Sequence, residues 1–271
     1  FNAVMVSYYI GHYADAAITV ARKVNYDVKL DVTDDNGKTI DDAVITLRDK
    51  DGSVIAPNED GTYTLGYGTY TYSAAKNGYV CYNGTFKLGS ADAADLVDGK
   101  LVKDTILTKA AEGAWDGTTK TEPKTDANGV YQISTGAELA WFAQTVNGGK
   151  GGISAVLTKD IDLAGYNWTP IGTNKSNSAH FTGSFDGQGH TVDNLYINYK
   201  ANTSAASPYQ GFFGYVYGKS TTNHAVIKNL TVRGDVILGG TKSVSTAYCG
   251  GVIGQAYDAD LTNIHAEVNV S

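Results

Sequence analysis

A repeat of about 34 residues in the second half of the chain constrains the fold most strongly. The segments HTVDNLYI, AVIKNLTV and DLTNIHAEV align on Asn194, Asn229 and Asn263, at intervals of 35 and 34 residues. Short β units that recur at such a period stack on one another, because one unit alone cannot bury its apolar face. Asparagine at the same position of each unit predicts a ladder of side-chain amides that hydrogen-bond from one unit to the next.

Glycines recur with the repeat as well. QGFFGYV and CGGVIGQA align Gly211 with Gly251 and Gly214 with Gly254. We expect these four glycines to lie at the corners of stacked coils. We assign them a structural role, as we do the three asparagines. The repeat does not indicate which residues bind a ligand. The pattern predicts a right-handed β-solenoid over residues 128–271. The repeat is still running where the sequence stops, so we expect a cap or further coils to follow.

One amphipathic helix is predicted between residues 135 and 147. Thr135 and Glu138 have the spacing of a capping box, in which each side chain bonds the backbone N–H of the other residue. The apolar face of this helix comprises Leu139, Phe142, Ala143 and Val146. Asn147-Gly148-Gly149 is a stop signal. We expect the helix to cap the first coil, because an open end leaves a strand edge unpaired.

Residues 25–110 predict a small β-sandwich. YDVKLDVTDDNGKTI alternates with the period of a half-buried strand, and about seven short strands are separated by Asn-Gly and Asp-Gly turns. Residues 1–24 are interpreted as the tail of a preceding module or an extended strand, and residues 111–127 as a linker. The predicted fold class is all-β, a small sandwich followed by the capped N-terminal part of a β-solenoid with one amphipathic helix.

Charge and cysteine content exclude several classes of function. Lys and Arg total 21 against 28 Asp and Glu, and this net charge of −7 gives no reason to expect nucleic acid as a partner. No apolar stretch reaches the ~18 residues that span a bilayer, so we expect no membrane insertion within this chain. Cys81 and Cys249 are interpreted as free thiols, with a single disulfide as the alternative, and two cysteines alone form no zinc site. We expect no cofactor.

Three aspartates and the tyrosines are the candidates for chemistry or binding. Asp160, Asp162 and Asp186 are candidate carboxylates for glycoside hydrolysis, or else solvated acids of an edge strand and a turn. The 5 histidines are isolated and none lies in HExxH, so the zinc-peptidase motif is absent. The 19 tyrosines either stack on sugars or pair across strands. We expect no catalytic residue and no metal site.

Two segments resemble known families. FTGSFDGQGHTVDNLYI, GFFGYV, IKNLTV, GGVIGQA and LTNIHAEV, with the lead-in GVYQISTGAELAWFAQTVNGG, resemble the GLUG-motif β-helix region of Gram-positive secreted and cell-surface proteins, over residues 128–271. DGTYTLGYGTYTYSAAKNGY, within residues 25–110, is similar to a transthyretin-like, carboxypeptidase-regulatory-like sandwich.

The resemblance implies an extracellular location, in the cell wall or secreted. It implies a non-catalytic structural or adhesive region that acts as a stalk or presents a binding face, with a host or bacterial surface glycan or protein as partner. One alternative is an accessory region of a secreted peptidase or carbohydrate-active enzyme whose catalytic domain lies outside this chain. The other is a carbohydrate-binding module that uses exposed tyrosines.

Overall fold

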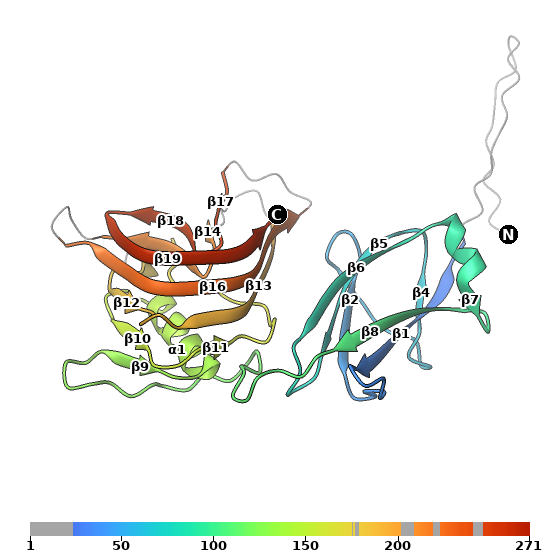
Figure 1. The fold of residues 1–271 in the computed structure, drawn as a ribbon. Helices are drawn as coiled ribbons and strands as arrows, with labels where there is room; N and C mark the ends of the chain where they lie inside the picture. Colours follow the sequence, from blue (N-terminus) through green and yellow to red (C-terminus); the bar gives the residue numbers. More distant parts are fainter. Residues whose placement is uncertain (1–23, 175, 177–178, 202–208, 219–222, 241–245) are drawn as a thin grey trace, which may run out of the picture.

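The computed structural model describes residues 24–174, 176, 179–201, 209–218, 223–240 and 246–271 (Figure 1). The chain is mostly β, as predicted. The strands up to Leu107 form two four-stranded sheets, and those from Tyr131 onward form one seven-stranded and two two-stranded sheets. The tail predicted for residues 1–24 lies outside the described residues, except for Val24, which packs against the first apolar cluster.

The two four-stranded sheets contain eight strands, one more than expected. One sheet has the order β4-β1-β8-β7, with β1 at Tyr26–Asp34, β4 at Tyr63–Leu65, β7 at Leu96–Val97 and β8 at Lys100–Leu107. The other has the order β3-β2-β5-β6, with β2 at Val44–Arg48, β3 at Val54–Ile55, β5 at Gly68–Ala75 and β6 at Tyr82–Leu88. A short 3₁₀ helix, η1 (Ser90–Asp95), precedes β7. Strands β1 and β8 pair in parallel, whereas the other pairs here are antiparallel.

The alternation read from the sequence decides which face of β1 is buried. Val28 and Leu30 are buried, and Lys29 between them is exposed. Both apolar side chains share one cluster with Leu47 of β2, which belongs to the opposite sheet. The two sheets therefore pack face to face around a common core, which is the layered arrangement of a sandwich.

The predicted helix is confirmed as α1 (Gly136–Asn147). Thr135 Oγ1 accepts from the backbone N–H of Glu138 at 3.2 Å, and Glu138 Oε2 accepts from the backbone N–H of Thr135 at 3.1 Å. All four predicted apolar residues are buried. The Phe142 ring lies 6.1 Å from that of Phe181 and 5.9 Å from that of Phe185, so the helix packs into the core of the second half.

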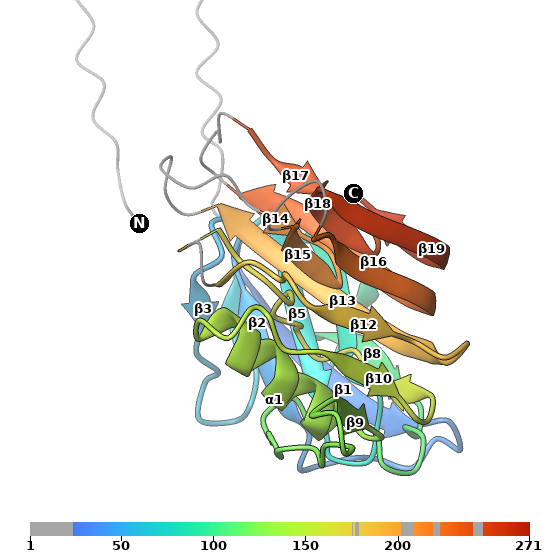
Figure 2. The same cartoon turned by 90° about the vertical axis from the view of Figure 1, so that its left-hand side faces the viewer.

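The strands of the second half pair only in parallel. The seven-stranded sheet contains β9 (Tyr131–Ile133), β10 (Ala155–Leu157), β11 (Ile161–Asp162), β12 (Ser184–Asp186), β13 (Thr191–Ala201), β16 (Ala225–Gly240) and β19 (Ala259–Val270). The two-stranded sheets join β14 (Tyr209–Gln210) to β17 (Tyr248–Cys249), and β15 (Phe213–Tyr217) to β18 (Ile253–Tyr257). Figure 2 shows β12, β13, β16 and β19 stacked in layers above α1, with β9 and β10 beside the helix.

The pairing register follows the repeat only between the last two units. Strand β16 pairs with β19 from Ala225↔Ala259 to Val236↔Val270, and this offset equals the 34-residue interval between Asn229 and Asn263. Between β13 and β16 the offset is 40 residues at Thr191↔Thr231 and 39 from Leu195↔Gly234 onward, and not the 35 of the sequence alignment. Equivalent positions of the sequence repeat are therefore not neighbours at this step.

The segment predicted as a linker packs against the second half. Trp115 is buried, its backbone N–H donates to Asp162 O at 2.9 Å, and its ring lies edge-on to Trp168 at 5.7 Å. Its indole N–H donates to Thr119 O, which holds the segment around the ring. Residues 111–127 therefore contribute a large side chain to the apolar core.

The four repeated glycines are needed for close approach of neighbouring strands. None of them has a positive φ. A Cβ on Gly214 would lie 2.5 Å from Gly172 O, and a Cβ on Gly211 or Gly254 would lie within 3 Å of backbone atoms of the adjacent repeat. A Cβ on Gly251 would instead meet Val268 Cβ at 2.8 Å. Atoms of neighbouring segments therefore leave no room for a Cβ at these four positions, although φ is ordinary at each of them.

We predict that Gly214→Ala lowers the free energy of unfolding by about 1–3 kcal/mol, because the added methyl group forces backbone strands apart. The matched control is Gly239→Ala, where a Cβ meets no atom within 4 Å and φ is ordinary for an L-residue. That variant should be neutral or more stable by about 0.4–1 kcal/mol, through a less flexible unfolded chain. Urea denaturation followed by circular dichroism measures both; equal stability of the two variants contradicts the close-approach role.

Candidate functional site

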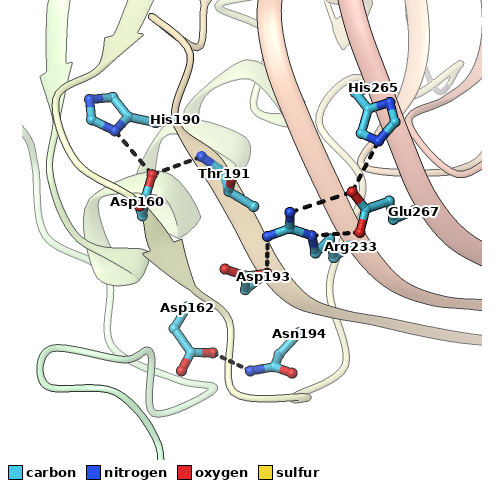
Figure 3. Close-up of polar contacts among 9 residues, drawn as sticks. All are labelled: Asp160, Asp162, His190, Thr191, Asp193, Asn194, Arg233, His265 and Glu267. Carbon is cyan, nitrogen blue, oxygen red and sulfur yellow. Dashed lines mark hydrogen bonds and ion pairs between the residues drawn. The ribbon is translucent and has the colours of Figure 1, made fainter.

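Polar side chains on the seven-stranded sheet connect one strand with the next. Asp160, just before β11, accepts at Oδ1 from the backbone N–H of Thr191 at 2.9 Å and contacts His190 Nδ1 at 3.0 Å (Figure 3). The pKa of Asp160 is lowered, first by the Thr191 N–H and then by His190, because both stabilise the ionised carboxylate. These bonds join the start of β13 to the segment that precedes β11.

Arg233 of β16 bridges to the strands on both sides. Its Nη1 lies 3.4 Å from Asp193 Oδ1 on β13, and its Nε donates to Glu267 Oε2 on β19 at 2.8 Å (Figure 3). His265 Nε2 lies 3.0 Å from the other oxygen of Glu267. The hydrogen bond from Arg233 lowers the pKa of Glu267. We call Asp160, His190, Asp193, Arg233, His265 and Glu267 the polar face. Its ion pairs are solvent-exposed, so each contributes little stability, but a slipped register would break them.

The amide ladder is formed by two of the three predicted asparagines. Asn263 Nδ2 donates to Asn229 Oδ1 at 3.1 Å, and Asn229 Nδ2 donates to Asp186 Oδ1 at 3.1 Å. Asn194 does not join this column: its Nδ2 donates to Asp162 Oδ1 at 2.8 Å (Figure 3). The reason is the register between β13 and β16, offset by 40 residues before Asn194 and by 39 after it, which places Asn194 away from Asn229. A single ladder through all three asparagines is therefore wrong.

The backbone conformation at the three repeat positions is a second reason why asparagine recurs there. Asn194, Asn229 and Asn263 have φ values of 54°, 52° and 53°, in the left-handed region. Among residues with a Cβ, asparagine is one of the few that enter this region readily. Each asparagine therefore bends its strand and supplies an amide donor at the bend, even where the partner is an aspartate.

The three candidate catalytic aspartates are all engaged in structural hydrogen bonds. Asp162 accepts from the backbone N–H of Ala164 at 2.7 Å and of Ala111 at 3.1 Å, as well as from Asn194. Burial alone would raise the pKa of Asp186, but bonds from Gln188, Asn229 and Lys228 outweigh it and lower that pKa.

A glycosidase needs a general acid whose pKa is raised. The pKa values of Asp160 and Asp186 are shifted the other way. A cleft of about 620 Å³ is lined by Asp160, Asp162 and Asp193, but these carboxylates point into hydrogen bonds with the protein itself (Figure 3). The hydrogen bonds of these three carboxylates join neighbouring segments of the sheet.

Among the described residues, the cysteines form no disulfide and no cluster of side chains is placed to bind a metal ion. Cys81 and Cys249 are free thiols, and burial raises the pKa of Cys81 to about 11, so this thiol stays protonated at neutral pH. Within the described part of the chain, no group of three or more His, Cys, Asp or Glu side chains is placed to hold a metal ion. In the same residues, no helix has the length and apolar character needed to cross a bilayer.

Two stacked tyrosine pairs were not singled out by the sequence. The rings of Tyr209 and Tyr248 stack at 5.0 Å, and those of Tyr217 and Tyr257 at 5.4 Å, each pair joining neighbouring strands. For Tyr217 and Tyr257 the signal was present in the aligned GYVY and GQAY segments of the two repeats. In the sandwich, Tyr70 stacks on Phe86 at 5.5 Å. These rings pair across strands, which is the structural alternative considered for the tyrosines.

A polar cleft of about 1080 Å³ lies between the sandwich and the seven-stranded sheet. We call it the inter-sheet cleft. The sandwich side includes Arg48 and Asn83, and the other side includes Asn167, Asn198 and Asp235. No sequence pattern pointed to it, because its lining comes from strands more than a hundred residues apart.

Two hydrogen bonds join the halves of the chain beside the inter-sheet cleft. The backbone N–H of Cys81 donates to Ala164 O at 2.8 Å, and Asn83 Nδ2 donates to Gly165 O at 3.0 Å. A Cβ on Gly165 would lie 2.8 Å from Cys81 O, so the two backbones are in direct contact.

Comparison with known proteins gives no family for this chain. Neither protein-family models, nor curated proteins, nor solved structures include a match to it. Inference about function therefore rests on the residues and their geometry.

We predict that Asn229→Ala destabilises the protein by about 2–5 kcal/mol, combining about 1–3 kcal/mol from lost amide bonds and about 1–2 kcal/mol from a left-handed alanine. Asn229→Gly removes the same amide but accepts the same φ, so it should be the milder variant.

The control for both variants is Asn128→Ala, at an exposed turn where the side chain makes no hydrogen bond with any described residue. Urea denaturation ranks the three proteins. An Asn229→Ala protein as stable as the Asn128→Ala protein rules out both roles assigned to Asn229.

Proposed function

We propose that this chain is a non-catalytic structural region of a bacterial cell-surface protein. In this proposal a sandwich leads into the first coils of a right-handed β-solenoid, which acts as a stalk or presents a face for adhesion. The observation that carries it is the parallel pairing of β16 with β19 at the interval of the sequence repeat. A stack with this register extends by adding units of one kind, without new contacts of another kind.

The last strand favours continuation of the stack. Strand β19 pairs with β16, and no described strand pairs with its other edge. Leu261 is 47% exposed, although Ile227, opposite it in β16, is fully buried. Val270 is 48% exposed opposite buried Val236. These apolar side chains occupy positions that a further unit would cover, as β19 covers β16.

The surface location rests on the resemblance of residues 128–271 to GLUG-motif regions. The acidic net charge of −7 suits a protein that must not bind anionic polymers non-specifically. The engagement of Asp160, Asp162 and Asp186 in structural bonds favours a non-catalytic role over an active site within the described residues. An accessory region beside a catalytic domain elsewhere remains the alternative.

A repeat-length insertion tests the solenoid. We predict that a second copy of residues 225–258, inserted after Asp258, adds one coil, because the copy brings its own β16 in register with the strands on both sides. Unfolding should stay a single transition, with a midpoint temperature equal to or above that of the parent, since stability grows with the number of stacked units.

The matched control is an insert of the same length and composition in scrambled order, which lacks the register of apolar and asparagine positions. It should lower the midpoint and leave the inserted amides unprotected in hydrogen exchange. If the true repeat and the scrambled insert behave alike, the solenoid proposal is wrong.

The surface role has its own test. Antibodies raised against residues 24–271 should label intact cells that express the protein, with no gain in signal after permeabilisation. A cytoplasmic marker, visible only after permeabilisation, controls for cell integrity. Labelling of this chain that also requires permeabilisation contradicts a surface location.

A further inference from the structure

The inter-sheet cleft has a regular floor made by two neighbouring parallel strands. Alternate residues of a strand point to the same side of a sheet. Beyond the bend at Asn194 the cleft is lined on this side mainly by alternate residues of β13 and β16, Tyr196 and Asn198 on one strand and Asp235, Ile237 and Gly239 on the other. Asn194, Leu195 and Gly234 complete this side of the lining where the register shifts. In the pairing register Tyr196 lies opposite Asp235 and Asn198 opposite Ile237, so the floor is a continuous patch of one sheet face.

Hydrogen bonds hold the polar groups of this floor in place. Asn198 donates from its backbone N–H to Asn167 Oδ1 at 2.8 Å, and from its Nδ2 to the Tyr196 hydroxyl at 3.0 Å. These bonds fix both amides but leave Asn167 Nδ2 and Asn198 Oδ1 without a partner among the described residues. A donor and an acceptor are thus set in position before any ligand arrives, which lowers the entropy cost of binding.

The remaining polar groups follow the same pattern. Asp235 accepts from Asn269 at one carboxylate oxygen, at 2.8 Å. On the sandwich side, Arg48 donates from Nη1 to Gly52 O at 2.9 Å, and Asn83 donates from Nδ2 to Gly165 O. In each of these three side chains a second polar atom has no partner among the described residues. The cleft therefore presents unsatisfied donors and acceptors from both of its walls.

The charge of the lining selects the class of ligand. Its charged residues are Arg48, Asp51 and Asp235, and Asp51 is also paired with Lys50 at 2.7 Å. One cation against two anions neither attracts phosphates and sulfates nor forms the oxygen-rich cage of a metal ion. Side-chain amides, a carboxylate and a half-buried tyrosine ring are instead suited to hydroxyl groups and to the apolar face of a sugar ring.

We propose that the inter-sheet cleft binds a neutral oligosaccharide. Its volume of about 1080 Å³ lies at the upper end of ordinary ligand pockets, so the cleft holds more than one sugar unit. The proposal rests on the presenting role inferred above, to which it adds a ligand class. The location differs from the stacked tyrosine pairs, whose rings contact one another.

Gly239 offers a direct test because it lines the cleft with open space where a Cβ would lie. Gly239→Phe places a ring in the cleft without a clash at its Cβ. The matched control is Gly89→Phe, because Gly89 has equally open space and lies outside the cleft lining. Asn198→Ala is the third variant and removes one fixed amide while leaving its backbone bond to Asn167 intact.

The experiment screens the full chain on an array of neutral and acidic glycans and measures the dissociation constants of the hits by calorimetry. We expect a neutral oligosaccharide to bind, Gly239→Phe and Asn198→Ala to weaken that binding about tenfold or more, and Gly89→Phe to stay within about twofold. Gly239→Phe, Asn198→Ala and Gly89→Phe should each keep the circular dichroism spectrum of the parent, which shows that the cleft and not the fold has changed.

Three results overturn the proposal: no binding of any neutral glycan, binding confined to acidic glycans, or equal binding by the Gly239→Phe and Gly89→Phe proteins. Each is distinguishable from failure of the structural role, which is read from the repeat insertion and from surface labelling. If the repeat insertion adds a coil and antibodies label the protein on intact cells, but no glycan binds, then the structural role stands and only the proposed ligand is wrong.

Discussion

Parallel pairing of β16 with β19, one repeat length apart, is the constraint on which the second half depends. It brings Asn263 to Asn229 and Glu267 to Arg233, so the hydrogen bonds and ion pairs between units follow from the strand register and do not create it. Close packing of the repeats beside β15 and β18 likewise excludes side chains at Gly211 and Gly254, where an added Cβ would lie within about 3 Å of backbone atoms of the adjacent repeat. Polar contacts at the surface contribute less than the buried strand pairing, but they penalise a slipped register.

The sequence predicted those features that depend on neighbours along the chain. The capping box of Thr135 and Glu138, the buried face of α1 and the alternation of β1 were all correct, because periodicity and caps are local. The single amide ladder was wrong at Asn194, because the register between β13 and β16 depends on connections whose lengths differ from one repeat to the next. The inter-sheet cleft was invisible for the same reason: Asn83 and Asn198 meet only through the fold.

The candidate aspartates illustrate how geometry changes the meaning of a residue type. In the sequence, Asp160, Asp162 and Asp186 were candidate catalysts, with solvated acids of an edge strand and a turn as the favoured interpretation. In the structure, each accepts backbone N–H groups at a bend or strand end, so the carboxylate satisfies donors that a parallel stack leaves unpaired. The stacked tyrosines contact one another and these acids bond to the protein itself, whereas the cleft between the two halves presents polar atoms without a partner among the described residues.

The left-handed bend at Asn229 has a consequence for how such a chain ages and diversifies. Loss of the amide nitrogen by spontaneous deamidation would turn Asn229 into an aspartate facing Asp186, replacing a donated hydrogen bond with repulsion between two carboxylates. Glycine adopts the left-handed conformation but has no side chain to donate a hydrogen bond, and most other residues adopt this conformation only at a cost in energy. Few substitutions at Asn229 therefore preserve both the backbone conformation and the donated hydrogen bond, whereas duplication of an entire repeat preserves both and lengthens the protein.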